Sequence, residues 1–462
     1  MIEPVYGDPD YTLHVGWDVD GGWDYDGDGY LDLVSTGAPD SAPSPGVDFW
    51  NGAGFDGRGF SGHFDTYLLD YVPVAFAGDV NADGYADVVV GSEEESEVYV
   101  YAGGADRPND WTWAFSEPEN WTPRVDGAGD VNADGYDDIV VGRAGSAYTL
   151  LGGADGPVSD GTTFSPGVTG IYVGDTVAGA GDVNGDGYDD VVVGAGLAAY
   201  AWVFYGSATG IVPDSWTELA LDAQPNTVDG AGDVNGDGYD DVVIGMPDAA
   251  GGGEAALFLG SASGLETTPA WRQFGACGPD EYGFGAAGVG DVNADGYADV
   301  AVSRRGVYWE TEVWVGSATG LPSTRSYVVP EASYDHLASA GDLDGNGADD
   351  IVIGAGVYLS DEVDADTDAD ADTDTACDTG DTDTDADSDT DTDADSDADA
   401  DADTDSAADT DPPPDDTGAP RDPGCGSGGK GGCATAPDGA GLVLPSAALL
   451  LALSRRRAPA GR

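Results

Sequence analysis

The stretch "GAGDVNGDGYDDVVVG", residues 179–194, returns as "GAGDVNGDGYDDVVIG" at residues 230–245. Its core is a nine-residue pattern with Asp at positions 1 and 9, Asp or Asn at positions 3 and 5, and Gly at position 6. The pattern occurs seven times, 51 to 58 residues apart, which predicts one structural unit per repeat. The seven copies are Asp24 to Asp32, Asp79 to Asp87, Asp130 to Asp138, Asp182 to Asp190, Asp233 to Asp241, Asp291 to Asp299 and Asp342 to Asp350.

Each unit contains four short segments with the composition of β-strands. A run such as "DVVVG" follows the aspartates, then a run such as "EVYVY" or "AWVFY", a turn such as "GSATG", and a weaker segment with Trp or Tyr. A small-residue segment ending in "AG" or "VG" precedes each loop. Four strands in each of seven units predict an all-β, seven-bladed β-propeller over residues 1–360, with the small-residue strand nearest the crowded axis.

The two ends of this region predict how the ring closes. The last unit lacks an outer strand before the acidic run begins, whereas "YTLHV" at residues 11–15 is a strand without a blade of its own. We therefore expect residues 11–15 to pair into the seventh blade and protect its edge.

Composition narrows the possible partners. The 462 residues carry 89 acidic and 14 basic side chains, a formal charge of -75. The only lysine is Lys430, and eight arginines precede residue 421, so the chain lacks the basic stripe that nucleic-acid binding requires. This charge excludes nucleic acid as a partner and favours cations.

Residues 361–423 differ from the repeats. The stretch 361–417 has 26 acidic residues, no basic one, and mostly Ala, Thr and Ser between them. Without apolar side chains it cannot bury enough surface to offset its ordering entropy, so the sequence predicts a disordered, self-repelling Asp/Thr/Ala-rich linker.

Residues 424–462 form a tail with a short apolar C-terminal segment. "GCGSGGKGGC" at 424–433 is followed by the apolar stretch 439–453 and by "RRR" at 455–457. This order predicts a sorting and anchoring signal that brings the tail to a membrane. The start "MIEPVYGDPD" shows no secretory signal peptide. Since the tail implies export, we expect the native start to lie elsewhere.

The repeated loop has the ligand pattern of a calcium site. Oxygen-bearing side chains at alternate positions of a tight loop, with a glycine for the sharp turn, suit a hard cation that takes six to eight oxygens. Position 7 would offer its backbone carbonyl, so its side chain can be Tyr or Ala. The predicted metal ligands are Asp24, Asp26, Asp28, Tyr30, Asp32, Asp79, Asn81, Asp83, Tyr85, Asp87, Asp130, Asn132, Asp134, Tyr136, Asp138, Asp182, Asn184, Asp186, Tyr188, Asp190, Asp233, Asn235, Asp237, Tyr239, Asp241, Asp291, Asn293, Asp295, Tyr297, Asp299, Asp342, Asp344, Asn346, Ala348 and Asp350.

The loop pattern has two other possible interpretations. An EF-hand needs a glutamate at position 12, where this chain has Ser, Val or Ile, so that interpretation is rejected. A single Asp/Asn/Gly loop is equally well an ion-free turn. Seven copies with aspartate at positions 1 and 9 favour a cation, because crowded carboxylates repel one another unless they are neutralised.

The motifs carry a family resemblance. "VAGAGDVNGDGYDDVVVGA" at residues 177–195, followed by "YAWVFYGSATG" at 200–210, resembles the FG-GAP repeat of integrin α-type propellers and their bacterial relatives, over about residues 11–360. The resemblance implies calcium in loops on one face and a role in adhesion or extracellular recognition. The tail, with Gly424, Cys425, the apolar stretch and the arginines, resembles a myxobacterial-type C-terminal sorting tail, which implies export to the cell surface.

These observations support a calcium-stabilised, surface-anchored binding or adhesion module, a monomeric propeller that recognises a protein or glycan through its loops. The alternative is a propeller-based extracellular hydrolase or lyase with its site in the axial funnel. No catalytic motif such as GxSxG or HExxH is present, and the three histidines stand in no nucleophile setting, so we predict no catalytic residue. A structural coat component is a third possibility.

Overall fold

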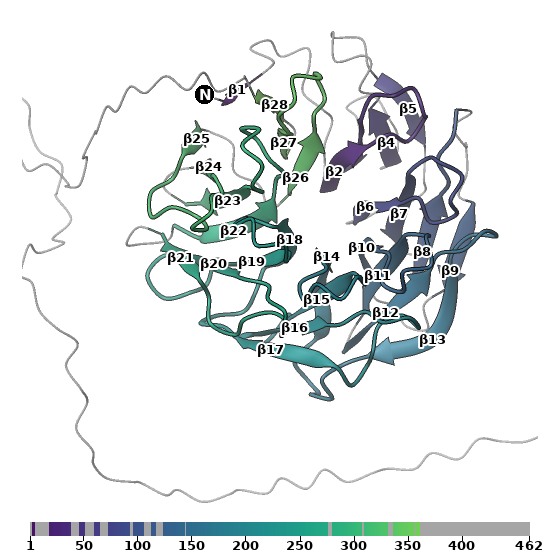
Figure 1. The fold of residues 1–462 in the computed structure, drawn as a ribbon, viewed down its shortest axis with the longest axis horizontal. Coiled ribbons are helices and arrows are strands. Elements are labelled where there is room, and N and C mark those ends of the chain that lie inside the picture. Colours follow the sequence, from purple (N-terminus) through teal and green to yellow (C-terminus); the bar gives the residue numbers. More distant parts are fainter. Residues whose placement is uncertain are drawn as a thin grey trace, which may run out of the picture. The chain divides into compact units, whose positions relative to one another are not determined.

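The computed structural model describes residues 2–4, 18–37, 46–50, 60–64, 73–92, 96–105, 112–116, 123–143, 145–275, 280–306, 309–330, 336–354 and 356–360. Within these ranges every helix-or-strand element is a β-strand, and the strands form seven four-stranded antiparallel sheets. Figure 1 shows the sheets arranged as blades around an axis. The predicted all-β, seven-bladed β-propeller is therefore confirmed.

Each blade has an innermost, a second, a third and an outermost strand. The innermost strands are β2 (Asp18–Trp23), β6 (Val74–Gly78), β10 (Arg124–Gly129), β14 (Val173–Gly181), β18 (Thr227–Gly232), β22 (Tyr282–Gly288) and β26 (Leu337–Gly341). The second strands are β3 (Asp32–Gly37), β7 (Asp87–Ser92), β11 (Asp138–Arg143), β15 (Asp190–Ala195), β19 (Asp241–Met246), β23 (Val300–Arg305) and β27 (Asp350–Ile353).

The third strands are β4 (Gly46–Trp50), β8 (Glu97–Tyr101), β12 (Ser146–Leu151), β16 (Tyr200–Phe204), β20 (Glu254–Phe258), β24 (Trp309–Trp314) and β28 (Gly356–Ser360). The outermost strands are β5 (Phe60–Phe64), β9 (Trp113–Ser116), β13 (Val158–Phe164), β17 (Trp216–Ala220), β21 (Trp271–Phe274), β25 (Tyr327–Pro330) and β1 (Ile2–Pro4). Every blade except the seventh is thus built from consecutive strands.

The N-terminus closes the ring. β1 pairs antiparallel with β28, with Ile2 opposite Ser360 and Pro4 opposite Tyr358. The innermost strands of blades seven and one, β26 and β2, also contact each other. An N-terminal strand does complete blade seven, but residues 2–4 provide it, and the segment 11–15 that the sequence suggested lies outside the described residues.

Glycine lets the innermost strands approach one another around the axis. A Cβ atom on Gly179 would lie 2.6 Å from the carbonyl oxygen of Gly127 in the preceding blade. A Cβ on Gly230 would lie 2.8 Å from the oxygen of Gly179, and one on Gly288 would lie 2.4 Å from that of Gly230. A side chain at these positions would push neighbouring blades apart, which explains why the strand nearest the axis is built from small residues.

The hydrophobic core lies between blades. The second strands of blades two, four and five, β7, β15 and β19, are buried along their whole length, as the continuous "VVV" and "VVI" runs predict. Val89 and Val98 of blade two pack with Ile139 and Val141 of blade three, and equivalent clusters lie at the other blade interfaces. Each blade therefore buries its two faces against the neighbouring blades. Because one blade alone has no core of its own, its stability depends on the complete ring.

The rest of the chain is a separate unit. Contacts divide the chain into Met1–Ala371 and Asp372–Arg462. The linker 361–423 and the tail 424–462 lie outside the described residues, so their predicted roles remain predictions. Among the described ranges, no helix is long and apolar enough to cross a membrane.

Candidate metal centre

All seven predicted loops join an innermost strand to the second strand of the same blade. In six loops the innermost strand ends directly before position 1, and in the sixth it ends at Gly288, two residues earlier. The second strand begins at position 9 or immediately after it, so the loops share one face of the ring. Exposure changes along each loop: in the fourth, Gly185, Asp186 and Gly187 are exposed, whereas Val183 and Asp190 are buried. The pattern recognised in sequence is therefore one structural motif repeated around one face.

Loop four shows how positions 1, 3 and 5 fold the turn. Asp182 at position 1 accepts the Asp186 N–H on Oδ1 at 3.1 Å and the Gly187 N–H on Oδ2 at 2.8 Å. Asn184 Oδ1 accepts the Asp186 N–H at 2.9 Å, and Asp186 Oδ1 accepts the Tyr188 N–H at 3.1 Å. These bonds aim the three oxygen-bearing side chains inward before any ion is considered.

Two positions of the loop take left-handed backbone conformations. Position 6 is always glycine, with φ of 88° at Gly187, as the sharp turn requires. Position 4 was not recognised from sequence: Ala133 holds φ of 56° there, and Gly185 holds 71°. Because an alanine costs roughly 1 kcal/mol in this region, the loop tolerates strain where a glycine is missing.

Position 9 connects the repeated loop to the rest of its blade. Asp241 is fully buried, and its Oδ2 accepts the N–H of Val234 at position 2 at 3.1 Å. Its Oδ1 accepts the N–H of Gly260, in the turn between the third and outermost strands, at 2.8 Å. Asp87, Asp138 and Asp299 make the same pair of bonds. Aspartate at position 9 is thus needed for folding as well as being a predicted ligand.

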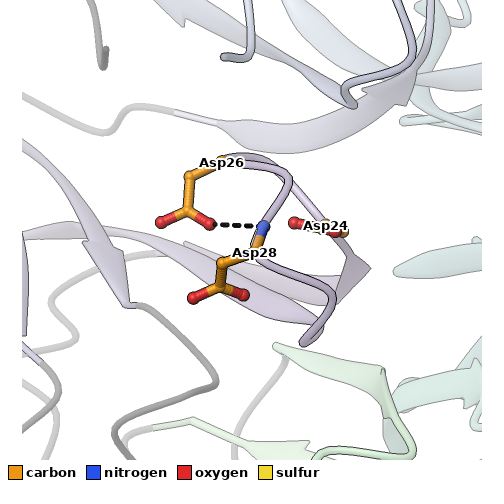
Figure 2. A group of neighbouring side chains, drawn as sticks. All are labelled: Asp24, Asp26 and Asp28. Carbon is orange, nitrogen blue, oxygen red and sulfur yellow. Dashed lines mark hydrogen bonds between the residues drawn. The ribbon is translucent and has the colours of Figure 1, made fainter. Parts of the chain in front are cut away.

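Carboxylates converge in the first and last loops. Asp24, Asp26 and Asp28 each place one oxygen within 4.8 Å of the others, and Figure 2 shows the three side chains around the turn, with the Asp28 N–H donating to Asp26. Asp342, Asp344 and Asp350 converge in the same way. These are the loops with aspartate at position 3, where all five others have asparagine, an equally suitable oxygen donor.

One predicted ligand atom is buried without a hydrogen-bond partner. It is Oδ1 of Asn132, at position 3 of the third loop. A buried oxygen without a donor costs free energy, and a cation at this place would satisfy it. The donor set therefore fits a calcium ion held by the predicted ligands.

Electrostatics point the same way. Burial, together with repulsion from the carboxylates of Asp233 and Asp237 at positions 1 and 5, raises the pKa of Asp241 to about 7. Burial also raises the pKa of Asp190 to about 8, again with repulsion from positions 1 and 5. A divalent ion would attract each of these carboxylates, which would outweigh their mutual repulsion and keep them ionised.

The position 7 tyrosine has a role that the sequence did not reveal. A Cβ added to Gly185 would lie 2.6 Å from the ring of Tyr239, the position 7 residue of the next loop. Gly236 stands in the same relation to Tyr297. The tyrosine therefore packs over position 4 of the preceding loop and links neighbouring loops, while the role of its carbonyl as a ligand remains a prediction.

Position 8 supplies an inter-blade contact that was also missed. Asp240 Oδ2 accepts the N–H of Asp182, position 1 of the preceding loop, at 2.9 Å. Asp137, Asp189 and Asp349 bond the preceding position 1 in the same way, at 2.7 to 2.8 Å. The sequence feature that could have indicated this contact is the pair of aspartates, "DD", at positions 8 and 9 of these four loops.

Three further aspartates lie on innermost strands of blades one, three and five. Asp20 Oδ2 accepts the N–H of Phe76 at 2.7 Å, and Asp126 and Asp229 accept those of Gly179 and Gly288, each at 3.1 Å. Each carboxylate thus caps an edge N–H of the next blade. Burial raises the pKa of Asp20 to about 7 and of Asp229 to about 8. The pKa of Asp126 is well above its ordinary value, from burial and from repulsion by the other two.

The other candidate reactive groups add no catalytic arrangement within the described ranges. His336 Nδ1 lies 2.9 Å from Asp18 Oδ1, so this histidine is paired with an acid. His14 lies outside the described residues, as does the side chain of His63.

Sequence comparison places the repeats in a known family. The FG-GAP-like repeat matches residues 79–141, 130–193, 182–244 and 233–302, which covers loops two to six. Curated relatives include integrin alpha-6 of Gallus gallus, 34% identical over 133 residues, or 26% of this chain and 12% of the relative. Integrin alpha-PS5 of Drosophila melanogaster is 32% identical over 154 residues, or 30% of this chain and 15% of the relative.

A longer match is to integrin alpha pat-2 of Caenorhabditis briggsae, 25% identical over 274 residues, or 47% of this chain and 22% of the relative. The matched part therefore spans less than a quarter of these relatives. Among solved structures, BBS1N from a complex with ARL6DN, soaked with mercury, matches with a TM-score of 0.51 at 13% identity, covering 78% of this chain and 98% of that one. This likeness concerns the fold alone.

Proposed function

We propose that this chain, an FG-GAP-repeat β-propeller protein similar to integrin alpha chains, is a calcium-stabilised module for adhesion or ligand binding. The observation that carries the proposal is the loop motif: carboxylate oxygens converge in the first and last loops, and Asn132 Oδ1, a predicted ligand in the third, is buried without a hydrogen-bond partner. The likeness to integrin alpha chains supports a recognition role without catalysis.

Calcium would act on stability. The ligands of one ion come from the end of the innermost strand, the loop and the start of the second strand, an arrangement absent from the unfolded chain. Binding free energy is therefore added to folding free energy. Because position 8 and position 7 side chains tie each loop to its neighbour, an ion in one loop also supports the interface with the next blade.

The proposed setting is the cell surface. The propeller, the acidic linker 361–423 and the tail 424–462 follow one another as a binding head, a spacer and an anchor. Mass spectrometry of the protein from its native host would test this order: a cleaved tail with modified Cys425 or Cys433 supports it, and an unprocessed cytoplasmic chain contradicts it.

The binding role is tested by ligand capture. The full chain is immobilised in calcium, exposed to surface proteins and to a glycan array, and washed with calcium or with EDTA. We expect a saturable ligand that is retained in calcium and released by EDTA. Failure to retain any protein or glycan in calcium would contradict the proposal.

One observation favours the alternative, a hydrolase or lyase in the axial funnel. Asp20, Asp126 and Asp229 have raised pKa values and interact across the blades, as acid-base residues do. Each, however, is engaged with a backbone N–H of the next blade, which gives it a structural task. Turnover of a polysaccharide that is lost in Asp229→Asn, with the fold intact, would establish the enzyme instead.

A further inference from the structure

Neighbouring loops are joined by a pair of hydrogen bonds between position 1 of one loop and position 8 of the next. At the junction of loops three and four, the N–H of Asp130 donates to Asp189 Oδ2 at 2.8 Å, and the N–H of Asp189 donates to the Asp130 carbonyl oxygen at 3.3 Å. Position 1 is a predicted ligand in its own loop, and position 9, which follows position 8, is a predicted ligand in the next loop. Predicted ligands of two neighbouring ions are therefore separated by one peptide unit and this pair of bonds.

A second connection runs from position 9 through the turn between the third and outermost strands. Asp190 Oδ1 accepts the N–H of Gly206 at 2.8 Å. The next residue, Ser207, donates its N–H to the carbonyl oxygen of Val131, position 2 of loop three, at 3.1 Å. The corresponding bonds link loop five to loop four and loop three to loop two. Order at position 9 of one loop is thus passed to positions 1 and 2 of the loop before it.

The pairing includes a carboxylate only where position 8 is aspartate. Three consecutive junctions, from loop two to loop five, have this residue. The bond from the position 1 N–H to the carboxylate is 2.7 to 2.9 Å long at these junctions, which involve Asp137, Asp189 and Asp240. Loop three, within this series, contains Asn132 Oδ1, the buried ligand oxygen whose hydrogen-bonding capacity a cation would satisfy.

Other junctions lack the carboxylate. Position 8 is Leu31 in loop one, Ala86 in loop two and Ala298 in loop six. Ala298 donates its N–H to the Asp233 carbonyl oxygen at 3.2 Å, so the backbone half of the pair is kept between loops five and six. In its pairing, this junction differs from the junction of loops three and four by one carboxylate–amide bond.

We propose that loops two to five bind calcium as a cooperative group, with the position 8 aspartates carrying the coupling between them. A hydrogen bond to a charged acceptor holds a backbone N–H more strongly than a bond to a neutral one. When position 9 of one loop is ordered by an ion, the adjoining position 8 carboxylate holds position 1 of the preceding loop in its ligating conformation. The second ion then binds a loop that is already ordered, and the coupling is reciprocal.

This inference rests on the proposed calcium binding and describes its regulation. The test is hydrogen–deuterium exchange of the full chain over a calcium titration, followed by mass spectrometry of loop peptides. Asp186→Ala removes an exposed ligand from loop four. It should raise the calcium concentration that half-protects loop three by at least about fivefold, the lower end of the usual coupling between linked sites. The matched control is Asp295→Ala, which removes the same position from loop six and should shift loop five much less, because Ala298 stands at that junction.

A second variant leaves every predicted ligand in place. Asp189→Ala removes the carboxylate between loops three and four, so adding Asp186→Ala to it should shift the half-protection of loop three no further. Asp349→Ala removes the equivalent carboxylate between loops six and seven, and the effect of Asp186→Ala on loop three should persist in it.

Equal shifts in Asp186→Ala and Asp295→Ala, or a loop three shift that survives Asp189→Ala, would overturn the coupling. If calcium protects every loop but the half-protection points are independent, the coupling proposal fails and the proposed calcium binding stands. If calcium protects no loop, both fail.

Discussion

Two aspartates of loop five allow the contribution of hydrogen bonds to folding to be distinguished from the contribution of a bound ion. Asp241 is fully buried and accepts N–H groups from Val234 and Gly260. Asp241→Ala leaves two buried donors unpaired, at about 1–3 kcal/mol each. The burial that raises the pKa of Asp241 to about 7 offsets part of this cost, so we expect a loss of about 2–4 kcal/mol in EDTA. In calcium the loss should be larger, because the variant also lacks a predicted ligand.

Asp237, at position 5 of the same loop, is exposed, and its carboxylate accepts the Tyr239 N–H at 3.2 Å. Without an ion, Asp237→Ala should cost no more than about 1 kcal/mol. With calcium at a hundredfold excess over its dissociation constant, a filled site adds about 2.7 kcal/mol, and losing a ligand removes most of that.

The assay is urea unfolding of the native chain and both variants, in calcium and in EDTA. Glu266→Ala, which removes an exposed acidic side chain outside the loops, is the control for net charge. We expect Asp237→Ala to be costly only in calcium and Asp241→Ala to be costly in both buffers. An Asp237→Ala cost that is the same in calcium and in EDTA would show that the loop is an ordinary turn, and would refute the reasoning.

Three further predictions concern the contacts between blades. The folded pKa of Asp229, about 8, exceeds the unfolded value of 3.8, so its stabilisation is complete below pH 4 and is lost as the pH rises through 8. Between pH 5 and 9 the free energy of unfolding should therefore fall by about 1–3 kcal/mol less in Asp229→Asn than in the native chain, allowing for solvent screening. Urea unfolding measures this difference, and an equal fall in both proteins would contradict the prediction. Asp240→Ala should lower the free energy of unfolding by about 1–3 kcal/mol, because the N–H of Asp182 loses its acceptor. The control is Ala298→Gly at position 8 of the sixth loop, where no carboxylate is present to lose. Gly179→Ala should lower the melting temperature strongly, because its Cβ meets a backbone oxygen at 2.6 Å, and a scan matching the native one would argue against close inner packing.

The repeats made most of the fold predictable. Aspartates at positions 1 and 9, the buried "VVV" runs and the small-residue strands each reflect local chemistry that is repeated seven times, so blade number, strand order and loop position follow from sequence. The closing strand was harder, since Ile2–Pro4 has only three residues and no alternating pattern, and pairing across the whole chain is not a local property.

The contacts between blades could not be predicted for a related reason. Asp240 and Asp229 look like ordinary members of an acidic sequence, and only the ring brings them to N–H groups of neighbouring blades. The two-residue bulge of β13 opposite β12 likewise depends on strand pairing that only the folded blade fixes. Sequence therefore identified residues that act within one loop, and missed those that act between repeats.

The most direct test of the account is native mass spectrometry of the full chain, first stripped with EDTA and then transferred into calcium. The account predicts discrete calcium adducts up to one per loop, seven in all, and one fewer in Asp237→Ala. A chain that keeps its metal-free mass in calcium, or that loses no ion in Asp237→Ala, would contradict the claim that these loops hold calcium.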